Sequence, residues 1–259
     1  FAATDPYHGR ELYMIHAPPS PTSPGDEGYH NPLRVAPRPI LLADIESGTE
    51  SSNPSGITSS GGQLPIYFAA YSASSGIELW MSNGESLPIR TTASNPNTQV
   101  VGSETVMVAD ICSGTRNSSP KYLTWYKGKL FFQANNGLLG NEVYVAEPEV
   151  VGSHPGSTTM SNGLTMADGT FLKVTVTMFI DIRLGLVSSN PAYFTIMPSP
   201  LNPSDEYMYF TASDGYLMGG AAGGAGSGSV IPNTNSEGVP EEEPYGGSQL
   251  WRYACFQAQ

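Results

Sequence analysis

One short unit recurs four times along the chain and constrains its fold more than any other feature. Each copy begins with an apolar segment that contains phenylalanine, passes through a polar turn and continues in a segment of the Glu-Leu-Trp type. The copies pair Phe1 with Glu11, Phe68 with Glu78, Phe132 with Glu142, and Phe210 with Gln249. The spacing is 10 residues in the first three copies and 39 in the fourth, where a glycine-rich insertion intervenes. Apolar segments on both sides of an Asn, Asp or Gly turn predict two antiparallel strands in every copy.

A second repeated strand carries an aspartate followed by isoleucine, at Asp44, Asp110 and Asp181, with separations of 66 and 71 residues. The phenylalanines of the first motif are separated by 67, 64 and 78 residues, so both motifs follow a similar period. Such self-similarity indicates stacked units that bury a common core. With a further strand near Leu123, each unit has four strands. The sequence therefore predicts an all-β fold, a β-propeller-like array of four-stranded antiparallel blades with long loops.

The repeats predict a single repeat domain over residues 1–259, with a leading half unit at 1–16 and full units at approximately 40–84, 105–147 and 174–253. The half unit begins at its third strand and the sequence starts inside a motif, so we expect the chain to be part of a longer protein. Strands from outside the sequence, the tail at 255–259 or a neighbouring molecule are the alternatives for completing the half unit. The last alternative would join molecules by strand addition and, where the contact does not close, give a filament.

The aromatic residues of the repeats are the expected core, because burying one such side chain contributes about 1.5–3 kcal/mol. The predicted core residues are Phe1, Phe68, Phe132, Phe210, Trp80, Tyr144 and Trp251. Turn chemistry is expected at Asp5, Asn135, Asn136, Asp214 and Gly215. The recurring aspartates, Asp44, Asp110 and Asp181, are expected to accept hydrogen bonds from the loop that follows each strand. Calcium binding is the alternative for these aspartates, and no other cofactor is expected.

The composition favours an all-β protein with long loops and excludes two classes of partner. Charged residues make up 13% of the chain, which contains 29 glycines and 22 prolines. A net charge of −12 with only 11 Lys and Arg argues against binding to nucleic acid or to an anionic membrane surface. Cations, basic proteins and neutral glycans remain as partners for this acidic chain, or the charge serves solubility alone. The most apolar run, 171–187, contains Lys173, Asp181 and Arg183, so no membrane insertion is expected.

Two cysteines and one sequon bear on the compartment. Cys112 and Cys255 form a candidate disulfide, with two buried free thiols as the alternative. Asn117 begins an Asn-Ser-Ser triplet in a polar loop and is the candidate N-glycosylation site of a glycoprotein.

Four segments of the third unit carry a resemblance to a known family. They are Ala109-Asp110-Ile111-Cys112-Ser113-Gly114, Ser118-Ser119-Pro120, the stretch from Leu123-Thr124 to Ala134, and Gly140-Asn141-Glu142-Val143-Tyr144. These segments, together with Glu78-Leu79-Trp80-Met81-Ser82-Asn83-Gly84, resemble the ELWxxDGT-type repeat. The resemblance covers most strands and misses the long loops; Val143-Tyr144, Gln249 and the missing threonine after Gly84 depart from the family pattern. It implies a β-propeller-like array in a large secreted or cell-surface protein, and it implies no catalytic residues.

Motifs of catalytic or metal-binding chemistry are weak in this sequence. The histidines, His8, His16, His30 and His154, lack the spacing of a zinc site, although His8 and His16 could converge with Asp5. Gly219 to Gly228 lacks the lysine of a phosphate-binding loop and indicates a flexible insertion. Glu241-Glu242-Glu243 is expected to be a solvated run. No Gly-x-Ser-x-Gly elbow stands between a strand and a helix.

The sequence therefore predicts a non-enzymatic structural or interaction protein. We expect a β-propeller repeat module of an extracellular, cell-surface or organelle-lumen assembly, either a filament or a large complex, with protein partners or self-assembly. A recognition propeller that binds glycans or proteins is the first alternative, and a propeller hydrolase or lyase is the second.

Overall fold

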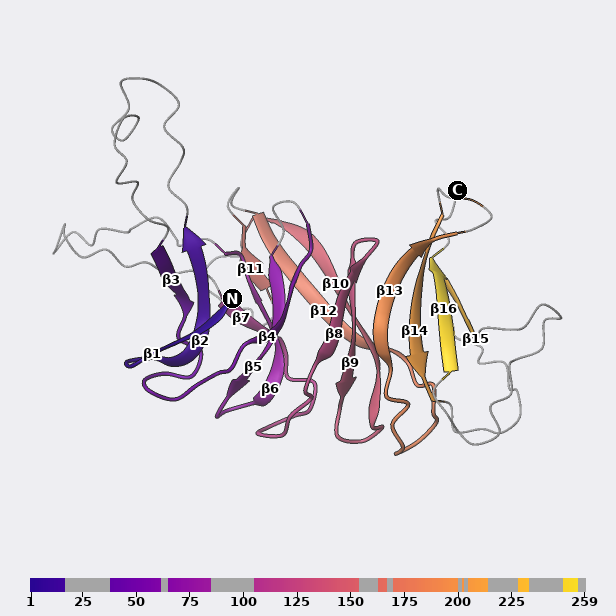
Figure 1. Cartoon of the computed structure of the whole chain (residues 1–259), viewed down its shortest axis with the longest axis horizontal. Coiled ribbons are helices and arrows are strands. Elements are labelled where there is room, and N and C mark those ends of the chain that lie inside the picture. Colours follow the sequence, from indigo (N-terminus) through magenta and orange to yellow (C-terminus); the bar gives the residue numbers. More distant parts are fainter. Residues whose placement is uncertain are drawn as a thin grey trace, which may run out of the picture.

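The computed structural model describes residues 1–16, 38–61, 65–84, 105–153, 163–166, 170–199, 202, 205–213, 228–232 and 249–255. These residues form sixteen strands and no helix. The strands make four antiparallel sheets of three to five strands, none of which closes into a barrel. The predicted all-β fold is thus confirmed. Figure 1 shows the sheets side by side in a row, in the order of the sequence.

Sheets 1 and 2 contain the first two copies of the repeat. Sheet 1 has the order β1 (Ala2–Asp5), β2 (Gly9–His16) and β3 (Arg38–Ala43). Sheet 2 has the order β4 (Ser55–Ser59), β5 (Ile66–Ser72), β6 (Gly76–Ser82) and β7 (Thr105–Ala109). Among the described residues, sheet 1 therefore has no strand at the position that β4 occupies in sheet 2.

Sheets 3 and 4 contain the remaining copies. Sheet 3 is formed by β8 (Lys121–Tyr126), β9 (Lys129–Asn135), β10 (Asn141–Ser153), β12 (Thr170–Ile180) and β11 (Gly163–Thr165), in that spatial order. Sheet 4 has the order β13 (Ala192–Pro198), β14 (Glu206–Ala212), β16 (Gln249–Cys255) and β15 (Gly228–Pro232). β15 comes from the insertion of the fourth copy, so the insertion supplies the last strand of its own sheet.

The phenylalanine strand and the Glu-Leu-Trp strand are neighbours in every sheet. Phe68 lies opposite Trp80, Phe132 opposite Tyr144, and Phe210 opposite Trp251. The strand that comes directly before Asp-Ile pairs with the preceding Glu-Leu-Trp strand, as β7 pairs with β6 and β12 with β10. The predicted units began with this strand. In the structure it is instead the last strand, in chain order, of the sheet that contains the preceding Glu-Leu-Trp strand.

The core is divided into three layers, each between two consecutive sheets. Leu12 and Leu42 of sheet 1 pack with Phe68 and Ala70 of sheet 2. The second layer joins Tyr67, Leu79 and Met81 to Phe132, Tyr144 and other residues of sheet 3. The third joins Phe131, Val143 and Val145 to Phe210, Trp251 and Tyr253. Each sheet therefore has a leading face, toward the preceding sheet, and a trailing face, toward the following one. The phenylalanine and tryptophan of the motif lie on the leading face.

The predicted core residues follow this layering. Phe68, Phe132, Phe210, Tyr144 and Trp251 are buried, and Trp80 is partly buried with its indole N–H donating to the Ala70 carbonyl at 3.1 Å. Phe1 is 46% exposed, and none of the sheets formed by the described residues covers the leading face of sheet 1.

Cys112 corrects one prediction. Its thiol is free and buried, so the bond to Cys255 is not formed in this structure. Of the predicted turn residues, Asp214 and Gly215 lie outside the described residues.

Candidate functional site

A buried carboxylate joins each of the first three sheets to the segment that leads into the next sheet. Glu78 in β6 has no exposed surface, and its two oxygens accept three hydrogen bonds. The backbone N–H groups of Ile111 and Ser118 donate at 2.9 and 3.0 Å, and the Ser118 hydroxyl donates at 2.6 Å. The same bonds link Glu11 to Ile45 and Ser52, and Glu142 to Ile182 and Ser189. We call each of these sets of Glu, Ile and Ser a clasp.

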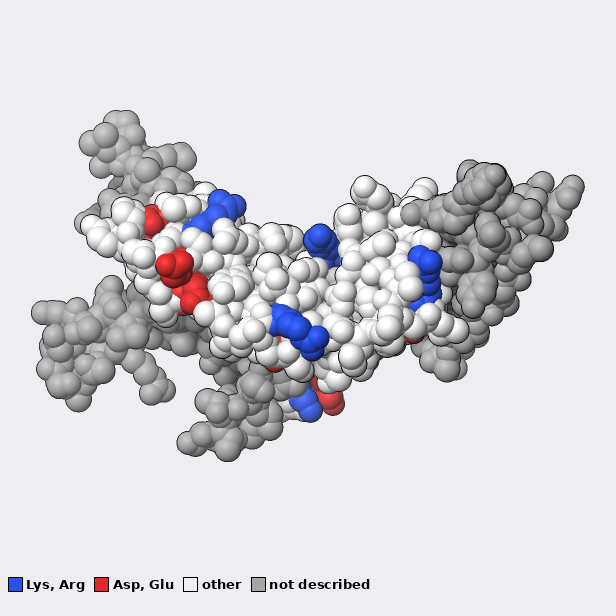
Figure 2. All heavy atoms as spheres, turned by 90° about the horizontal axis from the view of Figure 1, so that it is seen from below, with Lys and Arg blue, Asp and Glu red and all other residues white. Residues whose placement is uncertain are grey.

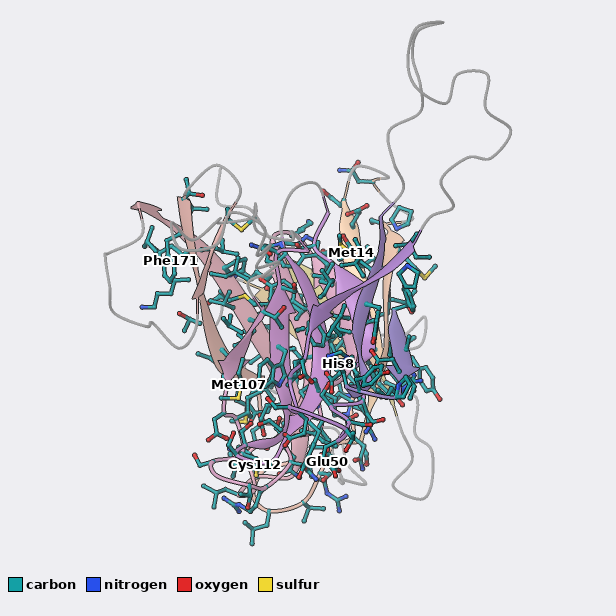
Figure 3. All side chains as sticks on the ribbon, turned by 90° about the vertical axis from the view of Figure 1, so that its left-hand side faces the viewer. His8, Met14, Glu50, Met107, Cys112 and Phe171 are labelled. Carbon is teal, nitrogen blue, oxygen red and sulfur yellow. The ribbon has the colours of Figure 1, made fainter. Side chains whose placement is uncertain are left out.

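The backbone of each clasp serine bonds to both neighbouring sheets. The N–H of Ser118 donates to the Ile77 carbonyl in sheet 2 at 3.0 Å, and the Ser118 carbonyl accepts from Asn135 in sheet 3 at 3.0 Å. The side-chain oxygen of Asn117 accepts from the Ile77 N–H at 2.8 Å. Figure 3, which looks along the row, shows Glu50 and Cys112, which belong to the first two clasp segments, near the bottom of the view, at the same edge of the sheets. The clasps therefore fix the end of each sheet against the next.

The clasp glutamates are structural groups in this geometry. Burial raises the pKa of Glu78 and of Glu142, and the hydrogen bonds from Ser118 and Ser189 oppose this rise. A general acid or base must reach the proton that it transfers, but both carboxyl groups are enclosed and already bonded within the protein. Their role is to position the strand that follows each clasp.

The recurring aspartates stand beside the clasps and differ between copies. Asp44 accepts from the Gly48 N–H at 3.4 Å, and Asp110 accepts from the Gly114 N–H at 3.1 Å. One side-chain oxygen of Asp181 is buried without a hydrogen-bond partner. The expected bonds to loop backbone are thus present in two copies. Within the described residues, no three His, Cys, Asp or Glu side chains gather in a group that could hold a metal ion.

Each clasp leads through a proline into an edge strand of the next sheet. These strands are β4, β8 and β13, and β8 contacts both of the others. All three have a shift in register, at Ser55/Thr58, Lys121/Thr124 and Ala192/Thr195, which marks a β-bulge. The bulges place equivalent residues of three different sheets along one side of the row.

The bulge holds one residue of each strand in the left-handed region. Gly56, Tyr122 and Tyr193 have φ angles of 64°, 56° and 56°. The carbonyl of each accepts a hydrogen bond from the threonine hydroxyl two residues later, at 3.0 to 3.1 Å. Glycine adopts this conformation freely, whereas a residue with a side chain is strained by about 1–2 kcal/mol. The two tyrosines are therefore held in a backbone conformation that their side chains disfavour.

The strained tyrosines present their rings together at the surface. Tyr122 is 40% exposed and Tyr193 is 70% exposed, and their ring centroids lie 5.4 Å apart at 51°. Exposed Ile57 of β4 and Thr195 of β13 lie on the same set of strands. Figure 2 shows a surface with only scattered charged atoms between wide uncharged areas. We call the exposed residues of β4, β8 and β13 around Tyr122 and Tyr193 the tyrosine edge.

A second polar cluster lies in sheet 1. Asp5 accepts hydrogen bonds from the Tyr13 hydroxyl and from the Tyr7 and His8 N–H groups, and it meets His8 Nδ1 at 2.8 Å. The bond from Tyr13, followed by the bond to His8, holds the pKa of Asp5 well below its usual range. The bond to Asp5 raises the pKa of His8, and burial raises the pKa of Tyr13 to about 12. His8 thus converges with Asp5 as the sequence allowed. His16 stands at the far end of β2 from Gly9, and its side chain lies outside the described residues.

The Asp5–His8 pair predicts a pH-dependent difference between the protein and His8→Gln. The lowered pKa of Asp5 adds stability that is lost as pH falls through its folded-state pKa. The raised pKa of His8 adds stability that is present below about pH 6.5 and lost as pH rises through the raised value. We expect the difference in melting temperature to be largest at about pH 5 and to vanish at pH 9, as measured by circular dichroism. A difference that is constant with pH would contradict an ionic role of His8.

The remaining predicted residues are placed as follows. Asn117 is exposed with its oxygen in a clasp segment, and its glycosylation stays a prediction. His30, His154, residues 219–227 of the glycine-rich stretch and Glu241-Glu242-Glu243 lie outside the described residues. Sequence reasoning missed the clasps and the tyrosine edge. The signal for the clasps was a Ser-x-Pro triplet, at Ser52, Ser118 and Ser189, that follows each glutamate after 40 to 47 residues.

Comparison of the chain with protein families, with curated proteins and with solved structures gives no match. Among the described residues there is also no helix with the length and apolar character needed to span a membrane.

Proposed function

We propose that the protein is a non-enzymatic interaction module whose sheets form a β-propeller-like array and which binds its partner through the tyrosine edge. The face-to-face packing of antiparallel sheets of three to five strands, joined by repeated clasps, supports the propeller-like arrangement. The resemblance to ELWxxDGT-type repeats supports a place in an extracellular, cell-surface or organelle-lumen assembly.

The presence of two tyrosines in a strained backbone conformation is the observation that carries this proposal. The equivalent residue of β4 is Gly56, which adopts the same backbone conformation without strain. Tyr122 and Tyr193 therefore reduce stability relative to glycine while placing two aromatic rings in solvent. Strain of this kind gathers at functional sites, and exposed tyrosine is enriched where proteins bind one another.

Recognition of a neutral glycan is the second candidate function. Two rings 5.4 Å apart offer apolar surface on which a sugar ring could stack, and hydroxyl groups of threonine lie on the same strands. The net charge of −12, with only 11 Lys and Arg in the chain, disfavours an anionic ligand. A hydrolase or lyase is less well supported, because the enclosed clasp glutamates cannot reach a substrate.

We expect Tyr122→Gly and Tyr193→Gly to keep or raise the free energy of unfolding, by about 0.5 kcal/mol each, while partner binding weakens at least tenfold. Relief of backbone strain exceeds the added freedom of glycine in the unfolded chain, so stability does not fall. Chemical denaturation measures the first effect. The matched control is Tyr71→Gly, since Tyr71 is 38% exposed in sheet 2 and lies away from the tyrosine edge.

Binding is read from two experiments on the full chain. Wild type and variants are applied to an array of neutral oligosaccharides, and a photoreactive amino acid at Thr195 records proteins that contact the tyrosine edge. A crosslinked protein that is lost in both tyrosine variants supports the first function, and a tyrosine-dependent array signal supports the second. Binding that is unchanged by both substitutions, or the absence of any ligand, would overturn the proposal.

A further inference from the structure

The leading face of sheet 1 exposes residues whose equivalents are buried elsewhere in the row. Ile15 is 61% exposed, whereas the equivalent Ser82, Ala146 and Tyr253 are at most 3% exposed. Phe1 is 46% exposed, while the other three motif phenylalanines are at most 1% exposed. The first sheet therefore presents an apolar face of the kind that the other sheets bury. Figure 3 looks at the molecule from this end, with labels on Met14 in β2 and on His8 in the turn before it.

The trailing face of sheet 4 shows the same contrast. Leu250 is 41% exposed, whereas the equivalent Leu12, Leu79 and Val143 have no exposed surface. Tyr209 occupies the position in sheet 4 that is equivalent to Tyr67 in sheet 2 and Phe131 in sheet 3. Those two side chains fill the second and third layers, whereas Tyr209 is only partly buried. The two ends of the row are thus the two halves of an interface that forms three times within the chain.

The side chains of the trailing face have the composition of a protein interface. The Arg252 guanidinium lies 4.9 Å from the centre of the Tyr207 ring, and Tyr207 meets Tyr209 edge to face at 6.5 Å. Tyrosine and arginine are enriched among the residues that carry most of the energy at protein interfaces. A positive group here also suits an acidic partner, and this chain itself carries a net charge of −12.

The fourth motif also lacks the charged group of the clasp. Gln249 replaces the glutamate of the other copies.

We propose that the trailing face of sheet 4 binds the leading face of sheet 1 of a second copy of this chain. The contact repeats the internal layers, with Leu250 and Tyr209 of one copy against Phe1 and Ile15 of the next. Because the two faces differ, the contact is heterologous and gives a ring or a filament. The proposal is independent of the tyrosine edge, which lies on the first strands of the sheets and stays open in such an assembly.

Sedimentation of the full chain over a range of concentrations tests the contact. Wild type is expected to gain mass with concentration, while Ile15→Glu and Leu250→Glu each remain monomeric. An equimolar mixture of the two variants is expected to stop at dimers, because each variant keeps one intact face and the two intact faces are complementary. The control is Leu186→Glu, since Leu186 is 81% exposed in a connecting segment and belongs to neither face.

Circular dichroism melting checks that all variants fold, which is expected because the substituted side chains are exposed. A monomeric wild type at every concentration would overturn the proposal. So would assembly of Ile15→Glu or Leu250→Glu to the size of wild type, since another surface would then join the copies. Failure here would leave ligand binding at the tyrosine edge intact, and the two proposals are therefore tested separately.

Discussion

Glu78→Ala is expected to lower the free energy of unfolding by about 3 kcal/mol. The substitution removes the acceptor of three hydrogen bonds and leaves the N–H of Ile111 without its partner beside an enclosed space. Unpairing a buried donor costs about 1–3 kcal/mol, and the bonds to Ser118 add to this loss. Urea denaturation measures the effect, and the loss should be visible in the midpoint with an unchanged slope.

Glu78→Gln tests whether the clasp needs a carboxyl group or only a side chain of the same shape. The amide oxygen can accept from the Ser118 N–H, but the amide nitrogen then faces the N–H of Ile111 as a second donor. We expect a loss of about 1.5 kcal/mol, between that of wild type and Glu78→Ala. Glu147→Gln is the matched control, because Glu147 is 44% exposed and forms only a surface ion pair with Lys129. Equal stability of Glu78→Gln and wild type would show that the clasp does not need a carboxyl group.

The clasp also has a pH dependence of definite sign. Burial raises the pKa of Glu78, so folding favours its protonated form. The resulting contribution of Glu78 to the free energy of unfolding is present below the ordinary glutamate pKa. It is lost as pH rises through the raised folded-state pKa. A protonated Glu78 can donate to the Ser118 hydroxyl, which then donates to the Ile77 carbonyl 3.3 Å away. The neutral form is therefore accommodated without breaking the clasp.

The strands could be predicted from the repeats, because strand and turn formation depend on the pattern of apolar and turn residues within a few neighbouring positions. Phe132 and Tyr144 could be paired from the sequence, since a tight turn fixes the register of a hairpin. The grouping into sheets was harder, because the Asp-Ile strand could pair with either neighbour along the chain. Its pairing with the preceding strand depends on the clasp, in which Glu78 reaches Ser118 across 40 residues.

The tyrosine edge could not be predicted for a related reason. The sequence Lys121-Tyr122-Leu123 does not indicate a positive φ angle at Tyr122. Tyrosine is among the residues least expected to adopt one. The bulge lies where the clasp serine and its proline lead into the edge strand of the next sheet. Its geometry therefore depends on how the sheets pack together, which a short stretch of sequence does not show. The Gly56 of the second sheet was the one local signal, because a glycine inside a short strand often marks a bulge.

Gly76→Ala is expected to cost about 3 kcal/mol or more, although it adds a single methyl group. Gly76 begins β6 with a φ angle of 72°, and a Cβ atom there would stand 2.4 Å from the Arg116 carbonyl oxygen. The left-handed conformation costs an alanine about 1 kcal/mol, and the overlap forces the clasp segment away from sheet 2. The segment cannot retreat without loss, because the adjacent Asn117 and Ser118 bond to Ile77 and Glu78.

Gly84→Ala separates the cost of the left-handed conformation from the cost of the steric overlap. Gly84 has nearly the same φ angle, 70°, but no atom within 4 Å of the position that a Cβ would take. We expect it to lose only the conformational part, about 1 kcal/mol. Thermal and urea denaturation of both variants give the difference, which measures how closely the clasp segment is pressed against the preceding sheet. Equal losses would mean that the segment moves freely, and the clasp would then not set the spacing of the sheets. Because Gly9 and Gly140 hold the same position before Glu11 and Glu142, with Cβ approaches of 1.8 and 2.6 Å, their alanine variants are expected to behave as Gly76→Ala does.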